Sequence, residues 1–216
     1  MIDLTKTALF AGIAPDELPP LLRQLDGTER HYAKGAVILP AGEPTERLGV
    51  VLSGCAAIGH DNVWGDHVLL SHVLPGEVFA EAYACVPQEP LMVRVSAVED
   101  TVVLFLRVSA ACAAGEHAYE RFRHNLLSAC AAKNLRLSRR MMHTSAKSIR
   151  GRLTSYFSEC VRRAGSRTFD IPFNRQQLAD YLGVERSALS GELSKMRRDG
   201  LLEYNKNHFT VREKAL

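Results

Sequence analysis

The 216-residue chain contains no long hydrophobic run. No apolar stretch approaches the ~20 residues that a membrane-spanning helix needs. Its first residues, MIDLTKTALFAG, also lack the basic start and long apolar centre of a secretory signal peptide. We therefore expect a cytoplasmic protein with no membrane partner.

Cysteine is sparse, and its spacing indicates no site. The cysteines form no CxxC pair, so the sequence predicts neither a zinc site, nor another metal site of that kind, nor a disulfide framework. The chain also lacks a Ser/His/Asp constellation and a glycine-rich loop that would hold phosphate groups. We expect reduced thiols and a protein that is not an enzyme. The cysteines are Cys55, Cys85, Cys112, Cys130 and Cys160.

Basic residues are scarce in the first part of the chain and abundant in the second. Residues 1–132 carry 9 Lys and Arg against 16 Asp and Glu, whereas residues 133–216 carry 18 against 8. An acidic surface repels nucleic acid and a basic surface attracts it. With 46% hydrophobic residues, the chain can bury a substantial core. We expect two folded parts, with any nucleic-acid surface in the second.

Residues 1–115 are predicted to form a β-rich sensor domain. After a helical opening, LFAGIAPDELPPLLRQL, short runs rich in Val, Ile and Leu alternate with glycine-containing turns. Such runs are typical of a jelly roll or a similar all-β barrel. The runs are AVILPAGE, LGVVLSGCAAI, HVLLSHVLPGEVF, LMVRVSAVED and TVVLFL.

Residues 116–143 are predicted to form a long dimerisation helix that ends in a hinge. The helix carries residues at spacings of three and four, as in the seam of a two-stranded coiled coil with one polar position. A single helix packed on its own domain fits the same spacing, so the spacing alone leaves both interpretations open. The seam residues are Leu127, Cys130, Asn134, Leu137 and Met141.

Residues 144–216 are predicted to form a winged helix-turn-helix. In FNRQQLADYLGVERSALSGELSKMRRDGLL, Asn174 is suited to cap a first helix and Gly183 to end it. The spacing of Leu189, Leu193 and Met196 turns one face of a second helix toward the core. Two apolar runs, LLEY and HFTV, follow and suit a hairpin wing. An ordinary helical hairpin with a solvated basic face is the alternative.

The outer face of the second helix is short and polar, as a helix in a DNA major groove requires. Cations at its far end favour both the helix dipole and DNA phosphates. The outer face carries Arg186, Ser187, Ser190 and Gly191, and the far end carries Lys195 and Arg197.

In this order, the parts resemble the cyclic-AMP receptor protein/fumarate-nitrate reductase regulator (CRP/FNR) family of bacterial transcription factors over nearly the whole chain. The resemblance implies an α+β chain: an N-terminal β jelly-roll (cyclic-nucleotide-binding-like) sensor domain, a long dimerisation helix and a C-terminal winged helix-turn-helix. It also implies a homodimer on a palindromic site in double-stranded promoter DNA, with RNA polymerase as a partner of an activator. The segments that carry it are LFAGIAPDEL, GEVF at residues 76–79, GRL at residues 151–153 and RQQLADYLGVERSALSGELSKMRRDGLL.

The resemblance also implies which residues bind DNA. In it, Asn174, Arg175 and Gln177 match positions that hold the phosphate backbone or support the turn. Many family members have Glu at the position of Ser187 and Arg at that of Gly191, a pair that reads a G·C-containing core, and neither is present. We therefore expect Arg186 to make the main base contact, worth about 1 to 3 kcal/mol of discrimination. The predicted DNA-binding set is Asn174, Arg175, Gln177, Glu185, Arg186, Ser187, Ser190, Gly191, Lys195 and Arg197.

The effector is predicted to differ from cyclic AMP. Cyclic-nucleotide binders of the family follow the Gly-Glu turn with an Arg-Ser-Ala cassette, whose Arg pairs with the cyclic phosphate. Here the aligned stretch reads PQEPL, in which Glu89 would repel a phosphate. Arg94 is near enough to substitute, although an outward position on a strand fits it better. The candidate effector-pocket residues are Gly76, Glu77, Val78, Phe79, Arg94, Leu137 and Ser138.

For other cofactors, the question is whether the sequence offers the side chains that would bind them. Oxygen-sensing members use a cluster of N-terminal cysteines, and this chain has none before Cys55, which excludes an iron–sulfur cluster of that kind. Haem stays open, although surface or structural roles are commoner for histidine than haem ligation. A thiol switch at Cys85 and a small organic effector are equally open. The candidate haem ligands are His60, His67, His72, Cys85 and Met141.

Two functions of different classes follow. The first is a dimeric, sequence-specific transcription regulator that is switched by a small effector, haem or a redox signal. The alternative is a haem- or small-ligand-binding sensor that acts mainly through protein partners. Its DNA binding would be weak or altered, because Gly191 stands at a base-reading position.

Overall fold

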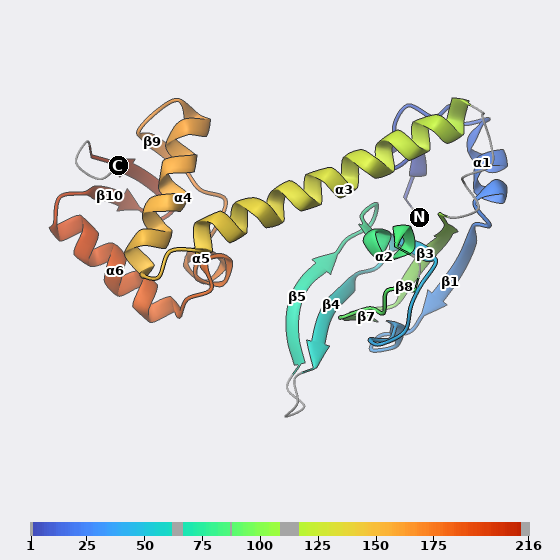
Figure 1. The fold of residues 1–216 in the computed structure, drawn as a ribbon, viewed down its shortest axis with the longest axis horizontal. Helices are drawn as coiled ribbons and strands as arrows, with labels where there is room; N and C mark the ends of the chain where they lie inside the picture. The colour runs from blue at the N-terminus through green and yellow to red at the C-terminus, as the bar shows by residue number, and fades with distance from the viewer. Residues whose placement is uncertain (1, 62–66, 87, 109–116, 213–216) are drawn as a thin grey trace. The chain divides into compact units, whose positions relative to one another are not determined.

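The computed structural model describes residues 2–61, 67–86, 88–108 and 117–212 (Figure 1). The chain divides into two compact units, residues 1–132 and residues 133–216. The division falls where the sequence changes from acidic to basic. The predicted boundary between residues 115 and 116 lies outside the described residues.

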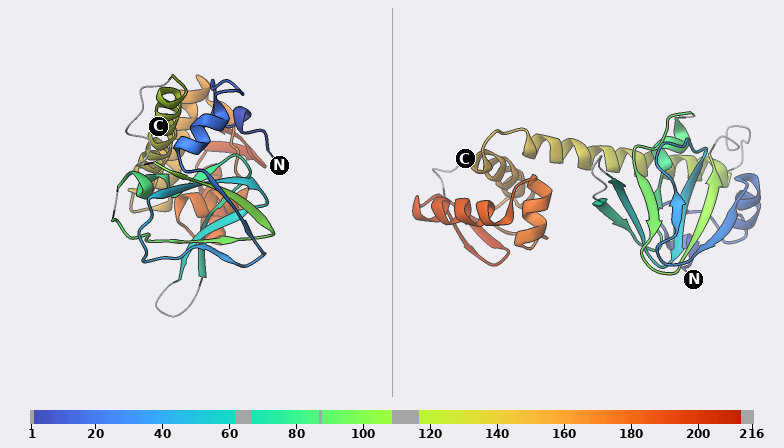
Figure 2. Two further views of the ribbon diagram at one scale, coloured as in Figure 1. Left: turned by 90° about the vertical axis from the view of Figure 1, so that its right-hand side faces the viewer. Right: turned by 90° about the horizontal axis from the view of Figure 1, so that it is seen from below.

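The first unit contains two four-stranded antiparallel sheets (Figures 1 and 2). One has the strand order β1-β8-β3-β6 and the other β2-β7-β4-β5. Because neighbours in each sheet come from distant parts of the chain, this is the predicted jelly roll. The strands are β1 (Thr28–Tyr32), β2 (Val37–Leu39), β3 (Arg47–Ser53), β4 (Ala56–Asp61), β5 (His67–Val73), β6 (Val78–Phe79), β7 (Arg94–Ala97) and β8 (Thr101–Arg107).

The sheet that contains β3 and β8 is buried on both faces. Side chains alternate between the faces of a strand, and on β3 the residues Leu48, Val50 and Leu52 join one apolar cluster while Val51 joins another. The first cluster includes residues of the helices, and the second lies among residues of both sheets. This double burial explains why β3 reads as a continuous apolar run in the sequence.

Phe79 of the GEVF turn is part of this core. Its side chain is fully buried, and its ring meets that of Phe105 edge-on with centroids 6.2 Å apart. A Cβ atom on Gly49 of β3 would lie 2.1 Å from Cζ of Phe79, so only glycine lets the two strands pair here. The last residue of the GEVF turn therefore belongs to the core between the two sheets.

Short helices and one polar strand complete the first unit. The helices are η1 (Leu4–Lys6), α1 (Leu18–Gln24) and α2 (Glu81–Cys85). Strand β1 was not predicted, because its sequence TERHY has no apolar alternation. It pairs with β8 at the edge of its sheet, and four of its five side chains are exposed.

The long helix α3 (His117–Thr144) is continuous over 28 residues. In the first unit it buries Tyr119, Phe122 and Leu126. Of the residues predicted to form a hinge near its end, His143 is buried within the second unit with only 2% exposure. Ser148 caps the next helix by accepting a hydrogen bond of 3.0 Å from the backbone N–H of Gly151.

The second unit is the predicted winged helix-turn-helix. Its hairpin, β10 and β11, turns at Lys206, which has a φ of 52°. A further short strand, β9, pairs with β11 and was not predicted, since three residues carry too little pattern. The elements are α4 (Ile149–Ala164), β9 (Thr168–Asp170), α5 (Arg175–Leu182), α6 (Arg186–Arg198), β10 (Leu202–Asn205) and β11 (His208–Val211).

One apolar cluster holds the second unit together. It joins α4, α5, α6 and the small sheet, and it includes the predicted inward face of α6, Leu189, Leu193 and Met196. These three side chains are at most 2% exposed. Among the helices in the described part of the chain, none is long and apolar enough to cross a bilayer.

Candidate nucleic-acid interface

The start of α5 is fixed by a capping box. The side chain of Asn174 accepts a hydrogen bond from the backbone N–H of Gln177, and the side chain of Gln177 accepts one from the backbone N–H of Asn174, both 2.9 Å. This reciprocal pair satisfies two N–H groups that a helix otherwise leaves unbonded. Of the two roles predicted for these residues, the structure places them in support of the turn.

Arg175 joins α5 to the wing. Its guanidinium carbon lies 4.7 Å from the ring centroid of Tyr204 and 5.1 Å from that of Phe209. Burial lowers the pKa of this guanidinium. Arg197, from α6, lies over Tyr204 as well, at 5.6 Å. The wing is thus attached to both helices of the motif through cation–π contacts.

The turn between α5 and α6 follows from Gly183. This residue has a φ of 63°, which favours glycine. Its N–H donates to the carbonyl of Asp180, and the N–H of Val184 donates to that of Ala179. These two bonds form a Schellman motif, which ends α5 and redirects the chain into α6.

Two arginines outside the motif bind the carbonyl end of α5. Arg140 of α3 donates to the carbonyl oxygens of Asp180 and Tyr181, at 2.8 and 3.0 Å. Arg152 of α4 donates through Nη1 to those of Leu182 and Gly183, at 2.8 and 3.0 Å. Sequence reasoning missed both roles. Arg152 lies in the GRL segment, but its acceptors are 30 residues away and carry no local signal.

The N-terminus of α6 is capped by Glu185. Its carboxylate accepts a hydrogen bond of 2.9 Å from the N–H of Ala188 and another from the hydroxyl of Ser187. The hydroxyl bond is the main reason that the pKa of Glu185 is lowered, followed by backbone hydrogen bonds. Of the predicted base-reading residues, Ser187 therefore has its hydroxyl proton engaged within the helix start.

The rest of the outer face is open. Arg186 and Gly191 are exposed and Ser190 is half-buried. A Cβ atom on Gly191 would meet nothing within 4 Å, so no part of this chain requires glycine there. The face is a polar surface without bulky side chains at its centre, which allows close approach of the α6 backbone to another surface.

The far end of α6 is bound to α4. Arg150 contacts Glu192 at 2.6 Å and Asp199 at 2.8 Å, and hydrogen bonds to these carboxylates raise its pKa. Lys195 lies 3.8 Å from Glu192 and is exposed. Glu192 thus neutralises part of the charge at this end, while Lys195 and Arg197 remain at the surface. Arg150 is a third positioning residue that sequence reasoning missed.

The effector-pocket candidates in the first unit are placed mainly in structural roles. Gly76 has a φ of 86°, and the carboxylate of Glu77 accepts a hydrogen bond of 2.9 Å from the N–H of Leu74. Val78 is half-buried, and Phe79 belongs to the core already described. Glu77 therefore stabilises its own turn.

The remaining effector candidates belong to other elements, β7 and α3. Arg94 on β7 forms an ion pair of 3.0 Å with Asp61 on β4. A phosphate at Arg94 would have to compete with this carboxylate. Leu137 and Ser138 are exposed residues of α3 that belong to the second unit.

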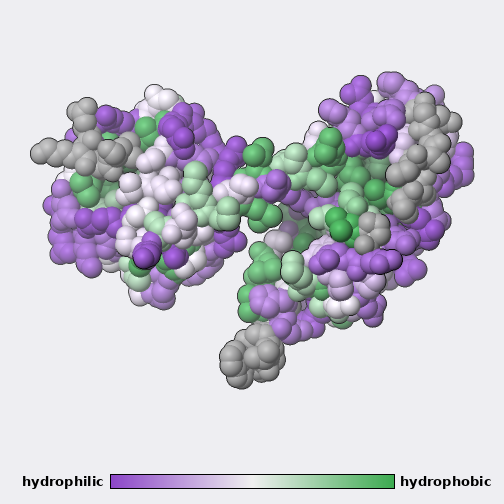
Figure 3. Space-filling model, viewed as in Figure 1, coloured by the Kyte–Doolittle hydropathy of each residue, from purple (hydrophilic) through white to green (hydrophobic). Residues whose placement is uncertain are grey.

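The predicted dimer seam is largely at the surface. Leu127, Leu137 and Met141 are 69%, 67% and 69% exposed, Cys130 is half-buried and Asn134 is exposed. Figure 3 shows apolar residues at the surface along α3. Of the two interpretations of the spacing, packing on the chain's own domain accounts for Cys130 but not for the other seam residues.

The candidate haem ligands come from β4, β5, α2 and α3. His60 is half-buried on β4 and His72 is exposed on β5, while the side chain of His67 lies outside the described part. In the described ranges, no group of three or more His, Cys, Asp or Glu side chains is arranged to hold a metal ion.

Two family models match the chain. One, described as "Cyclic nucleotide-binding domain", matches residues 29–111, and the other, described as "Crp-like helix-turn-helix domain", matches residues 151–216. Together they cover more than half of the chain. They fall on the jelly roll and on the winged helix-turn-helix respectively.

Two proteins of similar sequence agree with these matches. The "Cyclic AMP receptor protein" of Thermus thermophilus is 26% identical over 208 residues, which are 96% of this chain and 94% of the relative. The "CRP-like cAMP-activated global transcriptional regulator" of Mycobacterium tuberculosis is 30% identical over 78 residues. That match spans 36% of this chain and only about a third, 34%, of the relative's length.

A solved structure agrees with the fold. The crystal structure of the Thermus thermophilus catabolite activator protein has a TM-score of 0.51 to this chain at 26% sequence identity. The match covers 97% of this chain and 95% of that one.

Proposed function

Because this chain belongs to the CRP/FNR family of transcription regulators, we propose that it acts in the cytoplasm as a homodimer. In this proposal, each protomer presents α6 to one half of a palindromic DNA site. The sensor domain responds to a signal other than cyclic AMP.

The observation that carries the DNA-binding proposal is the outer face of α6. Capping by Glu185, the Schellman turn at Gly183 and the clamp from Arg150 hold this helix at both ends. Its inward side chains are fully buried, so its outward polar face is held in a fixed orientation. A rigid helix with short polar side chains is what entry into a major groove requires.

Arg186 is the proposed base-reading residue. It is exposed in the first turn of α6, the part of a recognition helix that contacts base edges. Its guanidinium matches the two acceptors on the major-groove edge of guanine. Lys195 and Arg197 would contact phosphates, which adds affinity without sequence preference.

The proposed homodimer pairs the two α3 helices. Exposed apolar side chains at seam spacing favour a second copy, because a partner helix would remove Leu127, Leu137 and Met141 from water. Asn134 would then be a polar seam position, which sets register at some loss of stability.

The proposed signal is not cyclic AMP. Support comes from Glu77, whose carboxylate binds its own turn, from Arg94, which is paired with Asp61, and from the exposed Glu89. An absorption spectrum of the purified protein separates the signal classes. A strong Soret band would assign haem, and its absence would leave a thiol switch or an organic effector.

The DNA-binding proposal is tested by selection of bound genomic fragments, followed by a salt titration on the selected site and on random DNA. We expect the selected fragments to share an inverted repeat that the protein binds at least about a thousandfold more tightly than random DNA. Equal affinity for both at every salt concentration would contradict sequence-specific binding.

A further inference from the structure

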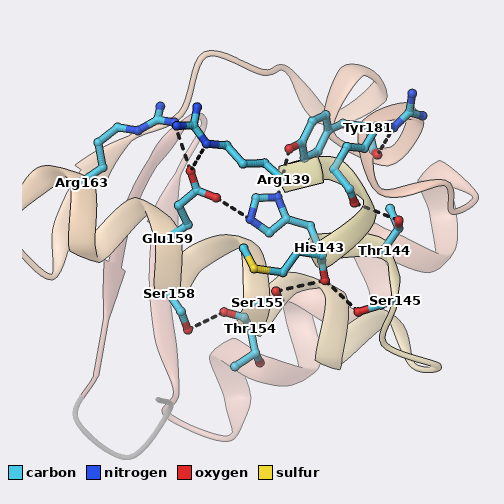
Figure 4. A network of polar contacts seen from close by, with 12 residues as sticks. Arg139, His143, Thr144, Ser145, Thr154, Ser155, Ser158, Glu159, Arg163 and Tyr181 are labelled. Atoms are coloured by element: carbon cyan, nitrogen blue, oxygen red, sulfur yellow. Dashed lines mark hydrogen bonds and ion pairs between the residues drawn. The ribbon is translucent and has the colours of Figure 1, made fainter. Parts of the chain in front are cut away.

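A pocket of about 360 Å³ lies in the second unit, away from the outer face of α6. It is formed by the end of α3, by α4 and by the residues around β9 and α5, and Figure 4 shows several of its side chains. Its volume is within the range of small-molecule sites in proteins. None of its lining residues belongs to the predicted DNA-binding set.

Aromatic rings form one wall of the pocket. The rings of Phe173 and Tyr181 are stacked, with centroids 5.0 Å apart and planes 29° from parallel. Tyr156 lies 6.1 Å from Phe173 and 5.6 Å from Tyr181, and the ring of His143 completes the group. Such a wall offers a flat apolar surface against which another planar ring can pack.

Guanidinium groups also line the pocket, beside Glu159. Arg139 and Arg163 both contact Oε1 of Glu159, at 3.6 and 3.2 Å, while Oε2 of Glu159 lies 2.7 Å from Nε2 of the buried His143 (Figure 4). One carboxylate is therefore shared by two arginines and a histidine. The arginine side chains stay 49% and 71% exposed, so they retain donors for a further acceptor.

Arg136 adds a third guanidinium to the lining. It is exposed on α3, and within the described residues it forms no ion pair. Among the described residues, the lining holds two carboxylates, those of Glu159 and Asp170, and Asp170 is bound to His208 at 2.9 Å. These three guanidiniums outnumber the two carboxylates even when His143 is neutral, and the excess of positive charge favours an anion.

From this geometry we propose that the pocket binds a small planar aromatic molecule that carries one oxyanion, a carboxylate or a phosphate. The aromatic wall would take the ring, and the forked donors of Arg136, Arg139 and Arg163 would take the oxyanion. A neutral analogue of the same shape would keep the ring contacts and lose the charge-assisted bonds.

The pocket stays open when α3 pairs with a second copy. At about 100° per residue, Arg136 and His143 project from the side of α3 that is turned away from Leu137 and Met141. The proposed dimer seam and the pocket thus use different faces of one helix. A ligand would contact α3, α4 and the residues on both sides of α5 together.

The test uses the full-length protein and isothermal titration with 2-naphthoate, 2-naphthyl phosphate and the neutral 2-naphthamide. We expect at least one anion to bind with a Kd about tenfold or more below that of the amide, which corresponds to about 1.4 kcal/mol. The preferred anion identifies the oxyanion. Equal binding of all three compounds, or no saturable binding of either anion, would overturn the proposal.

Variants of the pocket residues test whether the ligand binds in this pocket. Arg136→Gln should weaken the anion by roughly threefold to tenfold and leave the amide unchanged, and Ala164→Phe, at an exposed pocket residue, should block both. Arg162→Gln is the matched control, since Arg162 is exposed on α4 outside the pocket. Unchanged anion binding in Arg136→Gln, a variant that loses no ion pair, would overturn the assignment even if Ala164→Phe did not fold.

Discussion

Arg140 and Arg152, from two different helices, share the carbonyl end of α5. Arg140 takes the first two of four successive carbonyl groups and Arg152 takes the last two. A helix end leaves such acceptors unsatisfied, and charged donors satisfy them well because they also oppose the helix dipole. The orientation of the helix-turn-helix on α3 and α4 therefore depends on these two side chains. The acceptors are Asp180, Tyr181, Leu182 and Gly183.

Removal of these donors should destabilise the second unit unequally. Arg152→Gln should cost about 2 kcal/mol of unfolding free energy, because charge-assisted bonds to half-buried carbonyls are lost. Arg140→Gln should cost less than about 1 kcal/mol, since Arg140 is exposed. Thermal or denaturant unfolding followed by circular dichroism measures both. Arg162→Gln is the control, and a cost for it equal to that of Arg152→Gln would contradict the assignment.

Two glycines of the motif should respond oppositely to alanine. Gly191→Ala should stabilise the fold by about 0.5–1 kcal/mol, because glycine is poor within a helix and the added Cβ meets nothing. Gly183→Ala should destabilise it by about 1 kcal/mol, because its φ is 63°. Melting temperatures of the two variants provide the measurement. A stability loss in Gly191→Ala would show that the outer face is not free.

Two cations of α6 should differ in how they affect DNA binding. Arg186→Ala should reduce discrimination between the selected site and sites changed at one base pair by about 1 to 3 kcal/mol. Lys195→Ala should weaken binding to all sequences alike and reduce the salt slope by about one unit. Fluorescence anisotropy at several salt concentrations measures both. Uniform weakening by Arg186→Ala would assign it to phosphate contact instead.

One substitution on each face of α3 provides a matched pair of variants to test the proposed dimer. Leu137→Glu should favour the monomer, because a charge would enter the proposed seam. Leu135→Glu changes a residue that is also exposed, at 55%, but lies on the other face, so it should leave the dimer intact. Light scattering over a concentration series reports the mass. Equal behaviour of the two variants would place the interface elsewhere.

The cap at Glu185 should make the second unit acid-sensitive. Its lowered pKa means that the charged form stabilises the fold. This stabilisation is complete above the unfolded pKa of about 4.3 and is lost as the pH falls through the lower folded pKa. The wild type should therefore exceed Glu185→Gln in unfolding free energy at pH 7, and the difference should shrink below about pH 4. A difference independent of pH would exclude the charged cap.

Local pattern was sufficient for much of the architecture. The apolar runs of β3 and β8, the helix cap at Asn174 and the turn at Gly183 all depend on residues within a few positions of each other. Strands β1 and β9 were missed for the same reason, since an edge strand with exposed side chains and a three-residue strand carry no periodic signal.

Roles that depend on distant residues were assigned less well. Arg175 was expected to hold the phosphate backbone or to support the turn, and the structure places its guanidinium against rings of the wing. Ser187 was expected on the base-reading face, and its hydroxyl also serves the cap of Glu185. In each case the side chain has the predicted chemistry, but its contact partner depends on the tertiary structure.

By itself, the sequence determined the order of parts, the jelly roll, the winged helix-turn-helix and the separation of acidic from basic charge. These follow from periodicity, turn residues and composition, which act over short stretches. Only the tertiary structure decided which arginines hold α5, that His143 is buried against Glu159 and Tyr181, and that three guanidiniums meet an aromatic wall. Such contacts join residues 16 to 42 positions apart, and which partner a long polar side chain reaches depends on where the core holds the helices.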